Sequence, residues 1–531
     1  MDRAWDSARA ARRADFAQAV ADGRLTPFLV LHSLLVSMIV PTLWLSIPHV
    51  RRPRLYQTRW LVVAFVAACN LHLIWTSSSA NVFSAYFMGV FISSGILVTM
   101  NLLVWRRPQF DAARAVRALA PLKRPPPDQM AGSTPYDPRP SPNRDGTPGH
   151  EDRDAASFRS WRTEAALDDG LFVWQPFPAD APFSDRFGWA LDLVLSNRGS
   201  GWNSSISSIP HPPVDLPVGP GQPVRLRSMP RVTRSGYERC FTEGEFVRKR
   251  LLEVLAKYLV LDCCHVAMTK DPYFVLGADH AHRHPSHLLA LPAWQLHLYR
   301  QLIFLLFITS LLRIVSAIND LVQYWVFKIY FSSRAALWLY PSYFGSFSRV
   351  LDAGLAGWWG GWWHQTLRQP FSAPATYLRT HGYIKAGSSL AAAVTIFVSF
   401  LQSGLVHAAA SMTATPATTV WRPIAFFLLQ PVGILVQKTL VWLVQYLVPR
   451  PPRVVARTAN LLFALAWLHL TADFFVDDFA CGGVTLLELI PFSPLRWLAY
   501  GHATGHWWRW NRQMLPSWHS GKYWWMSGIA I

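Results

Sequence analysis

Two histidines in apolar surroundings are the side chains most able to do chemistry in this sequence. His407 lies inside an apolar stretch, residues 384–412, that is long enough to cross a bilayer. An ionisable side chain at membrane depth is costly, so it usually marks a functional site. Because a histidine can take up and return a proton near neutral pH, the sequence predicts proton-transfer chemistry there.

The second histidine, His364, lies in a tryptophan-rich string from Trp358 to Phe371. If the string is helical, His364 and Arg368 are four residues apart on one face, and Pro370 ends the pattern. An interfacial helix anchored by tryptophan and arginine is the alternative interpretation.

Gly404 and Ser403 precede His407 by about one helical turn. Gly404 would allow another helix or a ligand to approach closely. A histidine that only hydrogen-bonds a neighbouring helix is the alternative.

The composition is that of an integral membrane protein. Of 531 residues, 51% are hydrophobic and only 15% are charged, against about 25% charged in soluble domains. We therefore expect an all-α polytopic protein with roughly eight or nine transmembrane helices. The apolar segments are residues 26–47, 60–79, 83–104, 302–327, 384–412, 424–448 and 461–476, with weaker candidates at 251–268 and 485–500.

The net charge of +19 does not indicate nucleic-acid binding in such a protein. Its basic runs lie at the edges of apolar segments, as in Arg51–Arg54 and Arg248–Arg250, where they set topology. The 26 tryptophans suit belts at the headgroup level, and the five cysteines have neither zinc nor disulfide spacing. We expect insertion through the first transmembrane helix, without a cleaved signal, and hence the endoplasmic reticulum.

Shifts in composition predict four regions. Residues 1–106 form an N-terminal transmembrane bundle, 107–158 a proline-rich disordered loop, 159–250 a membrane-associated region and 251–531 the catalytic transmembrane region. The basic flanks place the long loop in the cytosol, so we expect the glycosylation pattern at Asn203 to be unused.

Two further polar groups are less specific. The string Asp279–His287 contains several histidines, but Arg283 and Pro285 interrupt it, so a solvated loop is preferred to a metal site. His469 and Asp473 are spaced as a histidine and its orienting carboxylate on one helical face. A membrane edge near Asp477 and Asp478 is the preferred interpretation of that pair.

Several motifs, in order, resemble the wax-synthase-like family of the membrane-bound O-acyltransferase superfamily. The resemblance spans about residues 159–498. It is carried by Asp192–Trp202, Tyr340-Pro341, Phe344-Gly345-Ser346, Trp358–Arg368 with its Trp-Trp-His-Gln core, and Ser403-Gly404-x-x-His407.

This resemblance implies an enzyme that joins an alcohol to the acyl group of an acyl-CoA, without a bound cofactor or metal. His407 would be the general base, and His364 or Gln365 would hydrogen-bond the developing oxyanion. Arg368, Gln365 and Trp363 would contact the acyl-CoA. The cosubstrate would reach the site from the cytosolic face and the hydrophobic alcohol from the bilayer.

The long proline-rich insertion favours the subgroup of acetyltransferases that act on terpenoids and related natural products, with acetyl-CoA as the donor. A wax synthase that esterifies long-chain fatty alcohols is one alternative. A transporter with intramembrane histidines is another, although the sequence contains none of the paired repeats typical of transporters.

Overall fold

Long helices dominate the computed structural model. It describes residues 2–118, 172–215, 217–278, 284–331, 334–414, 418–447, 451–483, 486, 488–500, 506–510 and 515–531. Within them, six helical segments are long and apolar enough to cross a membrane, and Val30–Ser46 is a shorter apolar helix. The six are Pro53–Thr76, Val82–Trp105, Ala293–Tyr330, Ser389–Met412, Trp421–Leu447 and Arg453–Gly482. The predicted all-α polytopic class is confirmed.

These segments are built from the following elements. The N-terminal part contains α1 (Asp2–Ala21), α2 (Val30–Leu34), η1 (Leu35–Ile39), α3 (Val40–Ser46), α4 (Pro53–Gln57), α5 (Arg59–Thr76), α6 (Val82–Met100) and η2 (Asn101–Trp105). The middle contains α9 (Phe183–Leu195), η4 (Leu226–Ser228), α10 (Glu243–Thr269), α11 (Pro272–Leu276), α12 (Ser286–Leu289), α13 (Ala293–Tyr330) and η6 (Leu337–Leu339). The remainder contains α14 (Ser348–Gly357), η7 (Trp358–Trp362), α15 (Arg368–Thr380), α16 (Ser389–Met412), α17 (Trp421–Leu447), α18 (Arg453–Gly482), α19 (Pro494–Trp497) and η10 (Trp524–Met526).

Fewer helices qualify as membrane spans than the eight or nine expected. The weaker candidate 251–268 does fold as a helix, α10, but its first turns carry several charged side chains and it packs along α13. There, Arg250 pairs with Asp320 of α13 at 2.8 Å, and both side chains are buried. Where residues 485–500 are described, they contain only the short helix α19.

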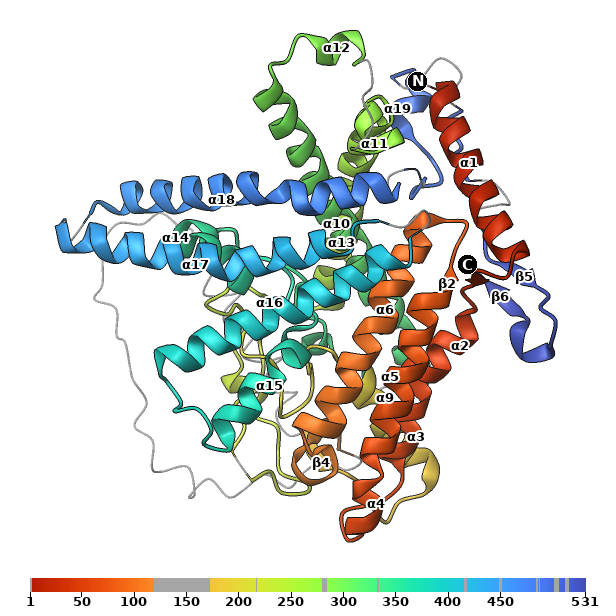
Figure 1. Ribbon diagram of the computed structural model, residues 1–531. Coiled ribbons are helices and arrows are strands. Elements are labelled where there is room, and N and C mark those ends of the chain that lie inside the picture. Colours follow the sequence, from red (N-terminus) through yellow and green to blue (C-terminus); the bar gives the residue numbers. More distant parts are fainter. Residues whose placement is uncertain are drawn as a thin grey trace.

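The helix that carries His407 and its neighbours lie in two groups (Figure 1). Helices α16, α17 and α18 run side by side, and α15 lies against α16. Helices α5 and α6 form a second group that meets α16 through α6. Gly404 of α16 lies against the backbone of α17, since a Cβ there would be 3.0 Å from the Ile424 Cα. The expected close approach at Gly404 is therefore made by a helix.

In the part of the chain that the structure describes, the strands form three small pairs. They are β1 (Thr26–Pro27) with β2 (Ser77–Ser78), β3 (Ala113–Arg117) with β4 (Phe172–Pro176), and β5 (Ser517–His519) with β6 (Gly528–Ala530). The second pair corrects the expected loop 107–158 at its start, where α7 (Pro108–Asp111) and β3 are ordered. The rest of that loop, from residue 119, lies outside the described residues, as does the stretch 159–171.

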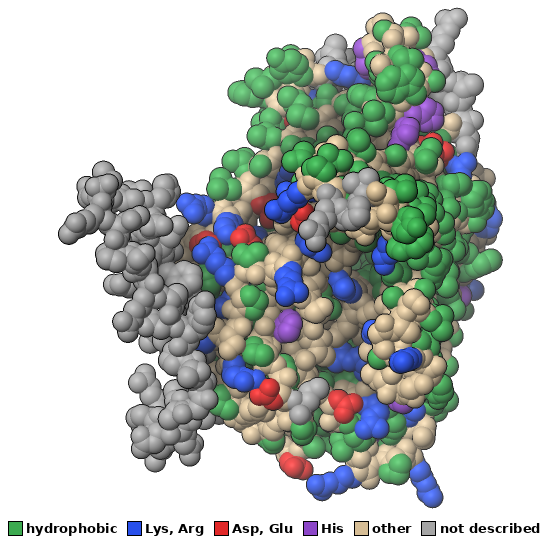
Figure 2. Space-filling model, turned by 90° about the vertical axis from the view of Figure 1, so that its left-hand side faces the viewer, with side chains coloured by type: hydrophobic (Ala, Val, Ile, Leu, Met, Phe, Trp, Pro, Cys, Tyr) green, Lys and Arg blue, Asp and Glu red, His purple; other side chains and the backbone are tan. Residues whose placement is uncertain are grey.

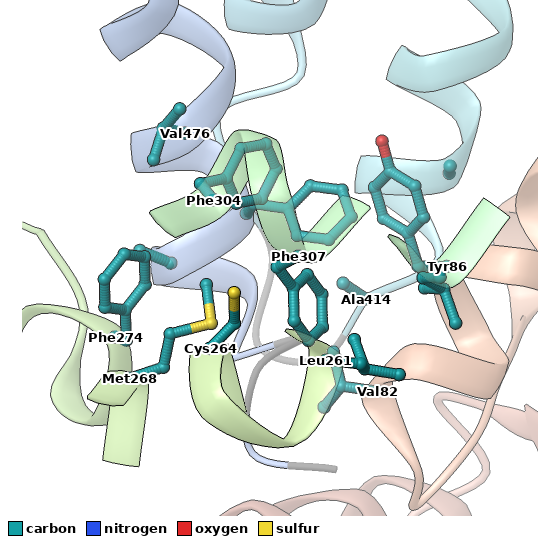
Figure 3. Packing of buried hydrophobic residues seen from close by; sticks show 14 of the residues in the cluster. Val82, Tyr86, Leu261, Cys264, Met268, Phe274, Phe304, Phe307, Ala414 and Val476 are labelled. Carbon is teal, nitrogen blue, oxygen red and sulfur yellow. The ribbon is translucent and has the colours of Figure 1, made fainter. Parts of the chain in front are cut away.

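The largest apolar cluster joins helices that are distant in sequence. Figure 3 shows Phe304 and Phe307 of α13 packed near Leu261 of α10, Val82 and Tyr86 of α6. The Tyr86 ring belongs to this cluster, whereas its hydroxyl points out of it. The cluster therefore fixes α6 against α13 and holds one polar atom at its border.

A glycine contact attaches the loop after η6 to the tryptophan-rich turn η7. The Gly345 N–H donates to the Trp362 carbonyl at 3.0 Å. A Cβ at Gly345 would collide with the backbone carbonyl oxygens of Gly361 and Ser235, whereas one at Gly360 would meet nothing within 4 Å. Only a residue without a side chain fits at Gly345.

We expect Gly345→Ala to lower the free energy of unfolding by about 1–3 kcal/mol, because rigid backbone must move to admit the methyl group. Thermal unfolding of the detergent-solubilised protein measures this as a fall in apparent Tm. Gly360→Ala, in the turn η7 that Gly345 contacts but with open space around it, is the matched control. Equal Tm values for the two variants would contradict this account.

Candidate functional site

The two sequence-predicted histidines line one cavity. Its volume is 2560 Å³, and its wall includes His364, His407, Trp363, Gln365 and Arg368. Sites for single drug-sized ligands occupy about 300–1,000 Å³. The cavity therefore has room for two substrates at once, and all five residues singled out from the sequence share it.

His407 is held on α16 by an aromatic cage and one hydrogen bond. Its ring stacks on Phe427 with 4.8 Å between centroids and meets the edge of Phe475 at 5.2 Å. Its Nδ1 atom lies 2.9 Å from the Tyr86 hydroxyl. The hydroxyl that leaves the apolar cluster of Figure 3 is thus the partner of His407. Among the described residues no hydrogen bond is made to the His407 Nε2 atom, which leaves this nitrogen for a ligand.

His364 follows the π-helical turn η7 and precedes α15, so it lies in irregular backbone. The expectation that His364 and Arg368 share a helical face is wrong, because α15 begins only at Arg368. Pro370 does not end a helix either. It sits in the first turn of α15, where its missing N–H is not needed.

The His364 ring lies between aromatic neighbours and is electrically neutral. It stacks on Tyr343 at 5.3 Å between centroids, and its Nδ1 atom is buried with no hydrogen-bond partner among the described residues. Burial, with smaller contributions from His407 and Arg198, lowers the pKa of His364 to about 3. A neutral imidazole with an unpaired nitrogen can donate a hydrogen bond to a ligand without carrying charge.

Gln365 organises the turn around it. Its amide nitrogen donates to the carbonyl oxygens of Trp359 at 2.8 Å and Trp363 at 2.7 Å, and its Oε1 accepts from Arg368 at 2.8 Å. The side chain is 6% exposed. Its donors are therefore engaged with backbone, and its position fixes Trp363 and Arg368.

The cavity is basic as well as apolar. Arg368, Arg198, Arg106 and Arg379 all line it. Burial lowers the pKa of Arg106 to about 10, and its Nη1 atom is buried without a hydrogen-bond partner among the described residues. Figure 2 shows Lys and Arg side chains gathered on one face, below a hydrophobic upper part. Such a cavity can take a ligand with an anionic end and an apolar end.

Two site residues escaped the sequence analysis. Tyr86 is 321 residues from His407, and nothing in its local sequence distinguishes it. Arg198 was within the Asp192–Trp202 motif but had no assigned role. It donates to the backbone carbonyls of Ser342 and Pro341, and it lies 5.8 Å from the centroid of the Tyr343 ring.

The Asn203 side chain makes hydrogen bonds to the backbone. Its Nδ2 donates to the Asp111 carbonyl at 2.7 Å, and its Oδ1 accepts from the Ala113 N–H at 3.1 Å. Of the histidine-rich string Asp279–His287, residues 279–283 lie outside the described residues.

Comparison with known proteins matches the same part of the chain. Residues 340–429 match the membrane bound O-acyl transferase family. This range contains Trp363, His364, Gln365, Arg368 and His407. The match confirms the resemblance inferred from the motifs and, with the six apolar helices, identifies a multi-pass membrane protein.

Two curated proteins are similar over about half of the chain. One is acetyltransferase ple2 of Rhodocybe pseudopiperita, 26% identical over 266 residues, which are 49% of this chain and 58% of that protein. The other is O-Mevalon transferase macI of Penicillium terrestre, 26% identical over 240 residues, which are 44% of this chain and 47% of that protein. The chain thus spans about half the length of each relative. No solved structure matches it.

Proposed function

We propose, from its likeness to the membrane-bound O-acyltransferases, that the chain is an acyl-CoA-dependent O-acyltransferase of the endoplasmic reticulum. Its donor is acetyl-CoA, and its acceptor is a hydroxyl of a terpenoid or another hydrophobic natural product. The observation that carries this proposal is the meeting of His407 and His364 in one cavity large enough for two substrates. The names of the two relatives, an acetyltransferase and an O-Mevalon transferase, support it.

In the proposed reaction, His407 is the general base. The reaction uses the tautomer with hydrogen on Nδ1, which donates to the Tyr86 oxygen 2.9 Å away, so that Nε2 carries the lone pair that faces the acceptor hydroxyl. Nε2 takes the hydroxyl proton as the alcohol oxygen attacks the thioester carbonyl carbon. When the C–S bond breaks, the proton passes from Nε2 to the departing thiolate, giving the ester and free coenzyme A.

In this proposal, His364 stabilises the negative charge that develops on the thioester oxygen. Its unpaired nitrogen donates to the oxyanion that forms at the thioester carbonyl, in a site shielded by Trp363 and Tyr343. Arg368, held by Gln365, supplies positive charge for the phosphates of the coenzyme.

We expect His407→Ala to reduce ester formation by about 10²–10⁴-fold, the usual contribution of a general base. Microsomes with either form are incubated with labelled acetyl-CoA or palmitoyl-CoA and a panel of terpenoid and fatty alcohols, and the esters are resolved. His72→Ala, an exposed histidine of another candidate span, is the control.

The products also separate the alternatives. A His407-dependent acetyl ester of a terpenoid supports the proposal, whereas a His407-dependent long-chain ester would identify a wax synthase instead. Ester formation that persists in His407→Ala would exclude the proposed base.

Tyr86→Phe should lower kcat about tenfold while leaving both KM values unchanged. The variant keeps the ring in the apolar cluster but removes the hydrogen bond that holds the His407 ring in place. Steady-state kinetics with purified protein measure this effect. Tyr258→Phe also removes a hydroxyl hydrogen bond, to the Phe492 carbonyl, without touching the cavity wall. An equal loss in that control would mean that Tyr86 acts only through stability.

Arg368→Gln is expected to raise KM for acetyl-CoA by about 10- to 100-fold, because a charge-assisted hydrogen bond to phosphate is lost. KM for the alcohol should stay the same. Arg457→Gln, which removes an arginine paired with Asp352 away from the cavity wall, is the matched control. Equal increases in both KM values of Arg368→Gln would indicate a general disturbance of the site.

A further inference from the structure

A second polar group lines the cavity, on α13 and α18. Gln301 of α13 and His469 of α18 are both part of the wall. The His469 Nδ1 atom lies 2.6 Å from the Gln301 Oε1 atom. The Gln301 Nε2 atom lies 2.7 Å from an Asp473 carboxylate oxygen and 3.1 Å from the His469 carbonyl oxygen. The other Asp473 oxygen lies 3.6 Å from His297 Nδ1 at the surface.

Chemistry alone decides where the hydrogens of this group lie. A carboxylate and a carbonyl can only accept hydrogen bonds, so the Gln301 atom facing Asp473 and the His469 carbonyl must be the amide nitrogen. The Gln301 atom facing His469 is then the amide oxygen, which also only accepts. The His469 Nδ1 atom must therefore carry hydrogen.

This assignment leaves the His469 Nε2 atom as a hydrogen-bond acceptor in the neutral ring. No hydrogen bond to it is made within the described part of the chain. Leu468 and Ala472 of α18 and Leu305 of α13 also line the cavity and are apolar. His469 thus adds a hydrogen-bond acceptor to a part of the wall that is otherwise largely apolar.

His469 lies at a different level along α18 from the contact that this helix makes with the proposed base. Phe475, whose edge contacts the His407 ring, is six residues further along α18. At 1.5 Å per residue, the two levels are about 9 Å apart along the helix. An acceptor whose reacting hydroxyl is at His407 would therefore place a distant part of its skeleton beside His469.

We infer that His469 binds a second hydroxyl group of the acceptor, so that the preferred substrate is a hydrophobic diol or polyol whose second hydroxyl is remote from the reacting one. The inference rests on the proposed function and specifies its acceptor class. His469 is assigned to recognition rather than to proton transfer, because the proposed function places the reacting hydroxyl at His407.

The test compares two acceptors in the acetyl-CoA ester assay. One is a rigid terpenoid diol with hydroxyls at opposite ends of its skeleton, and the other is the same molecule with the remote hydroxyl replaced by hydrogen. For the wild-type protein we expect KM to be about tenfold lower for the diol, because the mono-ol leaves the His469 acceptor atom unpaired.

His469→Phe keeps a ring but removes the acceptor atom, so KM for the diol should rise to that of the mono-ol while kcat stays unchanged. His72→Phe is the matched control. Gln301→Met removes the acceptor of the His469 Nδ1–H, so Nε2 is no longer held as the acceptor atom. This variant should also weaken the preference for the diol, and it replaces His469→Phe if that variant does not fold.

The outcomes separate this inference from the proposed function. Ester formation that requires His407 but does not distinguish the two alcohols would overturn the role of His469 alone. A fall in kcat for both alcohols in His469→Phe would overturn it too, since His469 would then take part in the chemistry. Absence of ester from both alcohols would overturn the acceptor class together with this inference.

Discussion

Backbone N–H and C=O groups that lie outside helices within an apolar bundle must form their hydrogen bonds inside the protein. The geometry of the candidate site depends on which groups provide those hydrogen bonds. The turn from Trp358 to Gln365 exposes carbonyl groups that no helix satisfies. The Gln365 amide and the Tyr237 hydroxyl both donate to the Trp363 carbonyl, and the Gly345 N–H donates to the Trp362 carbonyl. These bonds hold the backbone on which His364 is presented to the cavity, so the polar loops around it are part of the site.

Hydropathy and residue chemistry were sufficient to predict much of this architecture. Apolar runs of about 20 residues must become helices in a membrane, which is why α6, α16 and α17 could be placed from the sequence alone. An ionisable residue in such a run is costly unless it faces polar groups inside the protein. His407 and His364 could therefore be expected near each other. The prediction from helical periodicity failed between His364 and Arg368. A π-helical turn with two glycines precedes His364, and α15 begins only at Arg368, so the two residues do not share a helical face.

The remaining features come from contacts between distant parts of the chain. Tyr86 meets His407 across 321 residues, and Gln301 bonds the His469 side chain across 168. Neither contact has a local signature, because a tyrosine or glutamine in an apolar helix looks the same in the sequence whether it faces lipid or a histidine. The spacing of His469 and Asp473 allowed a direct pair, although a membrane edge was the preferred interpretation. The structure places Gln301 between the two side chains. The protonation pattern of His469 follows only from that three-residue arrangement.

The pairing of β3 with β4 has a consequence for how this protein can vary. Arg117 lies opposite Phe172 in the ladder, so the chain leaves and returns at adjacent points. The entropy cost of joining such points grows only slowly with the length of chain between them. The length of the connection between these strands can therefore change at small entropic cost while the strand pair keeps its ends in place. The strand pair makes this position a natural place for acquiring new segments, and an engineered tag or reporter could be inserted there.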